Sequence, residues 1–307
     1  MGNKQVKSRT LAPMHFTLAT FPNDLLRGHA TVGDAEILIC TDGTARFDGG
    51  AMFGVVPKTL WQRRMPADEH NRIAIGLNCV VVRLAGKTTL IETGFGNKLS
   101  PKLQTIYATQ QLLPASLAAA GVAPADIDFV INTHLHWDHC GWNTIRDEAG
   151  VHPFFPNAQY FTHTGEVDHG RHQFSRDRIS YVADNYEPLL ATGQMRLTDI
   201  AGDGVTEELS PGISIECFPG HTANLMVVHI HSRGEHACFV SDLIPTFAHL
   251  DETWVMAFDL DPLRTIAERS RLYRRALAED WLLLFPHDHL QPMARLNRDA
   301  SGAVKIL

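Results

Sequence analysis

The sequence lacks several features that would place it in a class at once. No apolar run among its 307 residues approaches the roughly 20 residues that a membrane-spanning helix needs. Positive charge is not in excess either: the net charge is −7, which gives no general attraction to nucleic acid or to an anionic membrane. No apolar signal core follows the polar, basic residues 1–10. We therefore expect a cytoplasmic protein without a nucleic-acid or membrane partner.

Cysteine is scarce, and its distribution excludes another class. The cysteines are five in number, which is odd, and they are widely separated, so a disulfide framework is not expected. Most lie in apolar, strand-like stretches, where a free cysteine acts as a small buried hydrophobe. This prediction covers Cys40, Cys79, Cys217 and Cys238, while Cys140 adjoins a histidine-rich segment that it could support or simply pack against.

The composition that is present is ordinary for a globular protein, with 44% apolar and 20% charged residues. A chain of this length can bury one large core or two modest ones. We expect one domain over residues 1–307. Residues 1–34 contain prolines and glycines without clear periodicity and are expected to form an N-terminal arm. Residues 150–193, rich in histidine, aromatic and charged residues, are expected to form an insertion or lid.

The most informative stretch is Thr-His-Leu-His-Trp-Asp-His at residues 133–139. His134 and His136 alternate along an extended segment after the apolar run 129–131, so they point to the same side. Asp138 and His139 stand where this strand gives way to a turn. Three imidazoles and a carboxylate cannot enter one core without leaving polar atoms unpaired. A metal ion removes that cost, and imidazole and carboxylate ligands suit zinc and similar ions.

The remaining pattern alternates between strands and helices. Residues 73–84 and 88–93 read as two strands joined by a hairpin turn at residues 85–87. The pair Asp261-Pro262 predicts the start of a helix, with Asp as N-cap and Pro in the first turn. On that helix we expect Leu263 and the apolar residues on the same helix face to point to the core. Arg264, Arg271 and Arg275 lie off that face and are expected to face solvent. Residues 281–285 read as a strand buried on both faces.

Three further candidate ligands each follow a predicted strand end: His221, Asp242 and His287. His289 is the alternative if His287 is assigned incorrectly. The two halves of the chain both run from strands through a helix to a strand that ends in histidine. This similarity predicts an α/β fold of four layers, an αβ/βα sandwich in which two mixed sheets pack face to face between outer helices.

These motifs, H-x-H-x-D-H, then P-G-H-T, S-D and P-H-D, resemble the metallo-β-lactamase fold superfamily in the same order along residues 35–290. The segments FGVVPKTLW, HLHWDHCG and SDLIPT are similar to the branch of quorum-quenching lactonases and methyl parathion hydrolase. The resemblance implies a homodimer and two divalent metal ions, most simply zinc, with manganese, iron or cobalt as alternatives.

Carried over residue by residue, the resemblance implies ligands for both ions. One ion would be held by His134, His136 and His221, the other by Asp138, His139 and His287, with Asp242 bridging them. The implied reaction is hydrolysis by a hydroxide held between the ions. Asp138 and Asp242 are the predicted catalytic residues, and Asp138 could also move the proton.

The implied substrate is a lactone or carboxylic ester, with acyl-homoserine lactones first. Pro245 stands where one lactonase branch has a tyrosine, which leaves related lactonases and phosphotriesterases open. Organophosphate or aryl-ester cleavage is the alternative, and a non-hydrolytic metal-binding or redox member of the fold is the alternative of another class. The residues predicted to line the substrate pocket, unless they pack only against their own domain, are Met52, Phe53, Trp61, Phe247 and Phe258.

Overall fold

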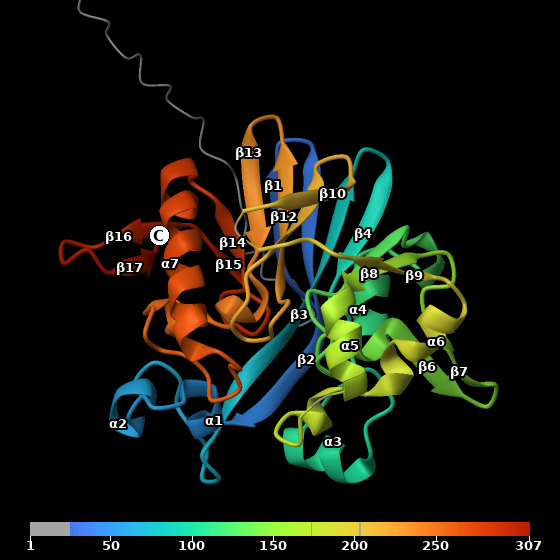
Figure 1. Ribbon diagram of the computed structural model, residues 1–307, viewed down its shortest axis with the longest axis horizontal. Coiled ribbons are helices and arrows are strands. Elements are labelled where there is room, and N and C mark those ends of the chain that lie inside the picture. The colour runs from blue at the N-terminus through green and yellow to red at the C-terminus, as the bar shows by residue number, and fades with distance from the viewer. Residues whose placement is uncertain (1–24, 173, 203) are drawn as a thin grey trace, which may run out of the picture.

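The computed structural model describes residues 25–172, 174–202 and 204–307, and two β-sheets form its centre (Figure 1). The first sheet has the strand order β1 (Leu26–Val32), β2 (Ala35–Asp48), β3 (Arg72–Leu84), β4 (Lys87–Ile91), β5 (Phe129–Ile131), β8 (Gln159–His163) and β9 (Met195–Thr198). The second has the order β10 (Thr206–Ser210), β11 (Ile213–Cys217), β12 (Met226–Ser232), β13 (Glu235–Phe239), β14 (Leu282–Leu284) and β15 (Met293–Ala294).

Both sheets are mixed. In the first, β1 to β4 pair antiparallel and β4, β5, β8 and β9 pair parallel. In the second, only the β13–β14 pair is parallel. Two hairpins stand apart from these sheets: β6 (Thr144–Asp147) with β7 (Gly150–Pro153), and β16 (Leu296–Arg298) with β17 (Val304–Ile306).

Helices cover the outer faces of the two sheets, as Figure 1 shows. Helices α4 (Leu113–Ala119), α5 (Thr164–His172) and α6 (Glu187–Ala191) lie on the side of the first sheet, and α7 (Pro262–Glu279) lies against the second. Three further helices, α1 (Gly49–Phe53), α2 (Lys58–Trp61) and α3 (Pro101–Tyr107), lie beyond the far ends of β2 and β3. The predicted four-layer αβ/βα sandwich is confirmed.

Strand β2 illustrates why the sheets are buried on both faces. Ile37 and Ile39 enter the core between the two sheets. Leu38 and Cys40, which alternate with them, enter the second core beneath α4. A strand with two buried faces needs an unbroken apolar sequence, which is what these positions provide. All five cysteines are free and buried, as predicted.

The hairpin predicted after residue 84 is confirmed: β3 and β4 pair antiparallel on either side of Ala85 and Gly86. Both turn residues have positive φ, at 52° and 74°, which is the backbone geometry of a two-residue hairpin turn. The buried strand predicted at residues 281–285 is also present as β14, whose three residues are all buried.

Helix α7 begins where its sequence predicts. The side chain of Asp261 accepts a hydrogen bond from the backbone N–H of Arg264 at 3.0 Å, and Pro262 occupies the first turn. Of the helices in the described part of the chain, none has the length and apolar character needed to cross a bilayer.

The faces predicted for α7 are wrong in part, although Tyr273 on the predicted apolar face is buried as expected. Leu263 is 78% exposed rather than buried. Arg271 and Arg275 do not face solvent; both turn toward the second sheet and pair with the buried carboxylate of Glu216 on β11. A guanidinium can lie against a sheet when a buried carboxylate balances its charge. The partner is distant in sequence, so the periodicity of α7 alone could not reveal it.

Two predicted segments differ from the sequence-based expectation. Residues 1–24 of the predicted arm lie outside the described residues, and the part at Leu26–Val32 is strand β1, paired with β2 in the first sheet. The expected insertion at residues 150–193 contributes β8, which lies between β5 and β9 in that sheet. Only the part after β8 has the character of a cover, with α5 and α6 outside the sheet.

Candidate metal centre

Each predicted ligand lies just beyond the end of a strand. The segment 133–139 follows β5, His221 follows β11, and His287 follows β14. Asp242 lies in a short 3-10 helix, Ser241–Leu243, directly after β13. These strand ends come from both sheets and meet at one edge of the sandwich, so side chains far apart in sequence can converge there.

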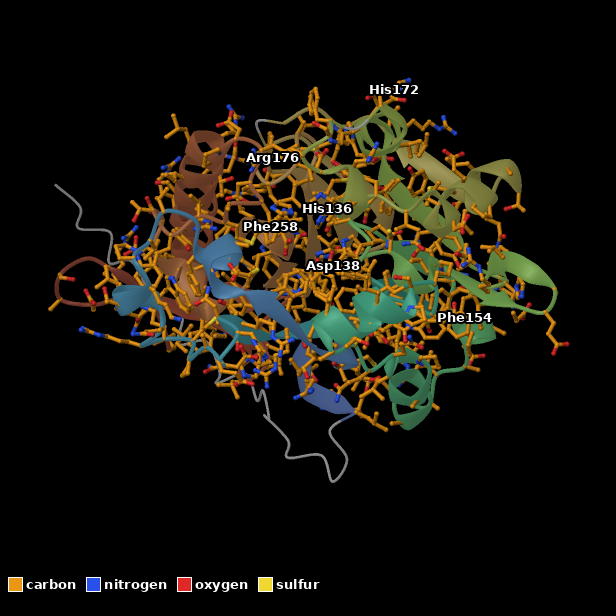
Figure 2. All side chains as sticks on the ribbon, turned by 90° about the horizontal axis from the view of Figure 1, so that it is seen from below. His136, Asp138, Phe154, His172, Arg176 and Phe258 are labelled. Carbon is orange, nitrogen blue, oxygen red and sulfur yellow. The ribbon has the colours of Figure 1, made fainter. Side chains whose placement is uncertain are left out.

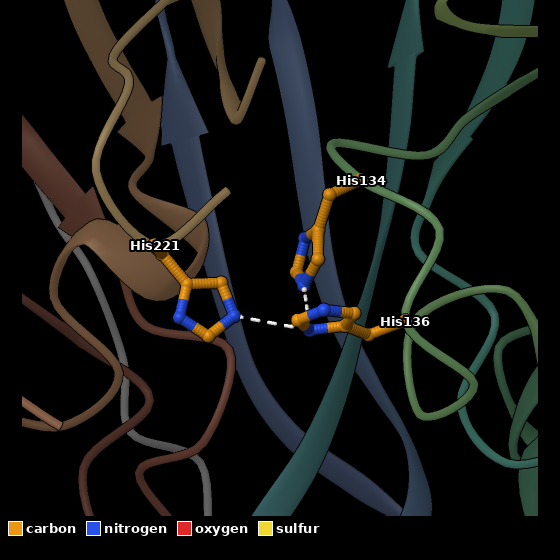
Figure 3. Close-up of side chains that lie close together, drawn as sticks. All are labelled: His134, His136 and His221. Atoms are coloured by element: carbon orange, nitrogen blue, oxygen red, sulfur yellow. Dashed lines mark hydrogen bonds between the residues drawn. The ribbon is translucent and has the colours of Figure 1, made fainter. Parts of the chain in front are cut away.

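Three imidazoles form the first group (Figure 3). Nδ1 of His136 lies 3.1 Å from Nε2 of His134 and 3.1 Å from Nε2 of His221. One proton cannot bridge all three nitrogens at once. Without an ion among them, the lone pairs of at least two of these nitrogens therefore face each other. Nitrogens bound to one tetrahedral zinc ion at 2.0–2.1 Å lie roughly 3.3–3.4 Å apart. The spacing is close to both a hydrogen bond and the separation within a shared metal site, so the convergence of three ring nitrogens is what favours a metal ion.

Asp138, His139 and His287 form the second group. Nε2 of His287 lies 3.2 Å from Nε2 of His139. The carboxylate oxygen Oδ2 of Asp138 lies 3.7 Å from Nε2 of His139 and 3.8 Å from Nε2 of His287. One ligand atom from each of the three residues falls within 4.8 Å of the others. His289 is not in this group; it lines a separate surface cavity near Arg46.

Asp242 lies between the two groups. Its Oδ2 is 3.3 Å from Nε2 of His221 and 3.5 Å from Nε2 of His139, and its Oδ1 is 3.1 Å from Nε2 of His287. Burial alone would raise the pKa of this carboxyl, but the neighbouring imidazoles outweigh burial and hold the pKa well below its usual value. Asp242 is therefore an anion in contact with members of both groups, which is the position of a bridging ligand.

The protonation of two rings is fixed by partners that can only accept hydrogen bonds. Nδ1 of His287 donates to the backbone carbonyl of Gly76 at 2.9 Å, and Nδ1 of His221 donates to the carboxylate of Asp259 at 2.9 Å. In its neutral form each ring therefore presents an unprotonated Nε2 to the other ligands. For His221 the carboxylates of Asp242 and Asp259 outweigh burial and raise the pKa, so a metal ion must displace a proton there. Metal-binding histidines commonly have this arrangement, because an acceptor on the far nitrogen sets both tautomer and orientation.

Burial controls the charge of two members of the first group, His134 and His136. Burial, followed by repulsion from the neighbouring imidazoles, holds the pKa of His134 and of His136 well below the usual value. For His139 the carboxylates of Asp138, Asp242 and Glu92 outweigh burial and raise the pKa. Neutral imidazole is the metal-binding form, so His134 and His136 are ready to bind, whereas a metal ion must displace a proton from His139.

Two carboxylates at this site escaped the sequence analysis. Glu92, just after β4, accepts hydrogen bonds from the backbone and hydroxyl of Thr133 and lies 3.5 Å from Nδ1 of His139. Asp259, just before α7, orients His221 and also accepts from the backbone of Met256 at 3.2 Å. Glu92 follows the end of β4 at Ile91, but it lay inside the strand predicted at residues 88–93, so the strand-end signal did not reveal it. Asp259 had no comparable signal.

A cavity of about 110 Å³ opens onto the site. Met52 and Phe258, both predicted pocket residues, line it together with Tyr107 and Trp137, and Figure 2 shows Phe258 close to His136 and Asp138. The cover after β8 contributes the stretch Arg176–Ser180. Arg176 reaches across the cavity mouth and donates to the backbone carbonyls of Ala257 and Asp259.

Three predicted pocket residues do not line this cavity. Phe53 and Trp61 are buried and stack on each other with ring centroids 5.2 Å apart, and Phe53 also stacks on His249 at 4.6 Å. They support α1, which carries Met52 to the cavity wall. Phe247 lines a different surface cavity, of about 600 Å³, next to Arg64. None of the candidate ligands lines that larger cavity.

Comparisons with known proteins agree with this geometry. A family model described as the metallo-beta-lactamase superfamily matches residues 74–289. The N-acyl homoserine lactonase AiiB of Agrobacterium fabrum is 25% identical over 189 residues, which are 57% of this chain and 64% of AiiB. The match thus spans less than two thirds of that relative.

Two solved structures are similar over most of their length. A probable metal-dependent hydrolase from Staphylococcus aureus is 29% identical with a TM-score of 0.81, covering 90% of this chain and 96% of that one. AidC, described as a dizinc quorum-quenching lactonase in complex with a product, N-hexanoyl-L-homoserine, is 21% identical with a TM-score of 0.76, covering 93% of this chain and 98% of AidC. At that identity the likeness to AidC concerns the fold.

Proposed function

Since the chain belongs to the metallo-beta-lactamase superfamily, we propose that it is a metal-dependent hydrolase with two divalent ions at the candidate metal centre. The observation that carries this proposal is the position of Asp242, whose two oxygens contact histidines of both ligand groups. The proposed ligands are those predicted from the sequence: His134, His136 and His221 for one ion, Asp138, His139 and His287 for the other, and Asp242 for both.

Zinc is the proposed metal, with manganese, iron or cobalt as alternatives, because nitrogen and carboxylate ligands accommodate all of them. When bound, the two ions would supply a hydroxide nucleophile near neutral pH and polarise the oxygen that is attacked. His221 and His287 keep their orientation through Asp259 and Gly76. The donor set, with the tautomers of two rings set by acceptors outside the centre, fits this metal chemistry once protons leave His139 and His221.

Asp138 is the proposed proton carrier. It lines the cavity and its side chain is 12% exposed, whereas that of Asp242 is 6% exposed. One carboxylate oxygen faces His139 and His287. A carboxylate at the border between ligands and cavity can take a proton from water and deliver it to a leaving alkoxide. Met52 and Phe258 would keep bulk water away from that transfer.

The proposed substrate class is a lactone or carboxylic ester, with acyl-homoserine lactones first. The lactonase activity named for AiiB and the product named in the AidC complex support this choice. The cavity itself offers apolar walls for an acyl chain and Tyr107 as a hydroxyl donor. Burial, with a smaller contribution from Asp138, raises the pKa of Tyr107, so its phenol stays protonated and can donate to a carbonyl oxygen. Tyr107 would thus offset the absence of a tyrosine at Pro245.

Aryl-ester or phosphotriester cleavage is the second proposal, because the cavity is rich in aromatic rings. Phe47, Tyr107, Trp137 and Phe258 all line it. Phe47 and Trp137 are stacked at 6.3 Å, and Phe258 meets Phe47 edge-on at 6.4 Å. Flat aromatic leaving groups pack well against such walls.

The test is a metal analysis of the purified protein combined with a rate panel of homoserine lactones, aliphatic lactones, aryl esters and phosphotriesters. We expect at least two ions per chain, lactone rates above phosphotriester rates, and loss of all activities on chelation. The order of rates decides between the two substrate proposals. Full activity in the chelated protein would exclude the proposed mechanism.

A further inference from the structure

A second set of histidines lies away from the candidate metal centre, on the face of the second sheet that turns toward α7. His229 and His231 alternate on β12, and His236 on β13 pairs directly with His231. We call these three residues the outer histidine cluster. Strand β12 begins beside the centre, where the backbone of Met226 bonds to Thr133. At about 3.3 Å per strand residue, His231 is roughly 16 Å further along, toward the β12–β13 turn at the top of Figure 1.

His229 has its tautomer fixed from outside the cluster. Its Nε2 donates to the buried carboxylate of Glu216 at 3.0 Å. Although burial would raise the pKa of Glu216, hydrogen bonds from His229, Arg275 and Arg271 lower it to about 2, so Glu216 is ionised and can only accept. In its neutral form His229 therefore has an unprotonated Nδ1, and this atom lies 2.9 Å from Nε2 of His236. A carboxylate on the far nitrogen is the usual support for a metal-binding histidine.

His236 is the centre of the cluster. Its ring lies 3.8 Å from that of His231 and 5.0 Å from that of His229, measured between centroids. Its Nδ1 is buried without a hydrogen-bond partner among the described residues, and the nearest carboxylate oxygen, on Glu279, is 3.8 Å away. Glu279 itself accepts from the indole of Trp281 at 2.9 Å.

Burial and the charges facing the cluster keep two of its imidazoles, those of His231 and His236, neutral. Burial, then repulsion from His229, His231 and Arg275, lowers the pKa of His236 to about 2. Burial and His229 also lower the pKa of His231, although Glu279 opposes them. Neutral rings are the form that binds metal, so no proton has to leave His231 or His236 before an ion enters.

The cluster is open to solvent on one side. His231 is exposed, and with His236 and Glu279 it lines a surface cavity of about 460 Å³ beside the β12–β13 turn. One ring nitrogen from each histidine lies within 4.8 Å of the other two. An ion can therefore arrive from water, meet three nitrogens, and keep water as a further ligand.

We propose that His229, His231 and His236 form a separate binding site for a divalent transition-metal ion, with Zn²⁺, Ni²⁺ or Cu²⁺ as the class of ligand that three imidazoles favour. The site joins β12 to β13, and through Glu216 and its arginines it also joins β11 to α7. An ion bound there would stabilise the folded chain without contacting the candidate metal centre. The proposal depends only on these side chains and is independent of the proposed hydrolase activity.

The test counts the zinc bound to the full-length protein. Wild type, His231→Ala and His70→Ala are dialysed against the same buffered free Zn²⁺, and bound zinc is measured by mass spectrometry. His231 is exposed, so its removal leaves the core intact, and His70, whose side chain is 67% exposed, is the control. We expect His231→Ala to bind one ion fewer than wild type, with affinity at this site reduced on the order of tenfold or more, and His70→Ala to match wild type.

A second variant, His236→Gln, keeps most of the ring's volume and removes its nitrogens, and we expect the same loss of one ion. Circular dichroism confirms that each variant is folded. Equal zinc binding by wild type, His231→Ala and His236→Gln overturns the proposal. An added zinc equivalent should also raise the melting temperature of wild type but not of His231→Ala, and equal shifts in both proteins would count against the site.

Discussion

Oδ1 of Asp242 lies 3.1 Å from Nε2 of His287, although the whole of helix α7 separates these two residues in the chain. The other oxygen of Asp242 lies 3.3 Å from His221. One buried carboxylate therefore contacts a histidine from each ligand group. Neither group alone has a negative charge in this position, so the proposed centre depends on Asp242 more than on any other single residue.

Asp242→Ala should lose both metal ions and all hydrolytic activity. The variant removes the only proposed ligand shared by the two ions and leaves their positive charges close together. Metal content and the rates on every substrate in the panel should fall together, by at least the 10²-fold expected when a metal site collapses. Asp34→Ala, which removes a carboxylate that is 55% exposed, is the control and should keep its metal. A variant at position 242 that retains both ions would contradict the bridging role.

Asp259→Asn should weaken metal binding without abolishing it. Asp259 sets the tautomer of His221 from outside the ligand set, and loss of such a partner costs about 10–100-fold in metal affinity. Competition with a coloured chelator measures the affinity directly. Asp34→Asn serves as the matched control. If Asp259→Asn binds metal as tightly as wild type does, the orienting role assigned to Asp259 is wrong.

Tyr107→Phe should lower kcat/KM for lactones about tenfold while metal content stays unchanged. A single neutral hydrogen bond contributes roughly 0.5–1.5 kcal/mol, and the upper part of that range corresponds to tenfold. The ring remains, so its contacts with Phe47 and Trp137 are kept. Rates on lactones and on substrates without a carbonyl should therefore separate. Unchanged kcat/KM for all lactones would remove Tyr107 from the mechanism.

Glu216→Gln should destabilise the chelator-treated protein by about 3 kcal/mol at pH 7, because Arg271 and Arg275 lose a buried partner. The pKa of Glu216 is lowered to about 2 in the folded chain, below its value in the unfolded chain. Its stabilising effect is therefore fully present above the unfolded pKa and is lost as the pH falls toward 2.

Urea unfolding at several pH values measures this effect. The difference in unfolding free energy between wild type and Glu216→Gln should be constant from neutral pH down to about 4.5 and then shrink with further acidification. The opposite trend, a difference that grows as the pH falls, would contradict the charge assigned to Glu216. Asp34→Asn again provides a control, since its surface pair with Arg233 contributes little.

The convergence of the proposed ligands could be predicted from the sequence because each follows a strand end, and strand ends of a layered sandwich gather at one edge. The start of α7 could be predicted because Asp261 and Pro262 act locally. The four-layer fold followed from the repeated order of strands and helices in the two halves. The signals for the ligands and for the start of α7 lie within a few residues of the feature that they predict, whereas the signal for the fold is the order of elements along the chain.

The rest depends on contacts between distant segments. The exposure of Arg271 and Arg275 on α7 was predicted incorrectly because their partner, Glu216, lies far away in the sequence on β11. Phe53 and Trp61 were expected beside the substrate, but they stack on each other and do not line the cavity. Likewise, nothing near Asp259 in the sequence indicates that its carboxylate orients His221. Only the folded chain brings these pairs together.

The most direct test of the central claim is a crystal structure of the zinc-loaded protein with anomalous scattering measured at the zinc edge. Two anomalous peaks should lie about 3.5–4 Å apart, one among His134, His136 and His221, the other among Asp138, His139 and His287, with Asp242 touching both. A single peak between the groups, or zinc bound elsewhere while these seven side chains remain without metal, would contradict the account.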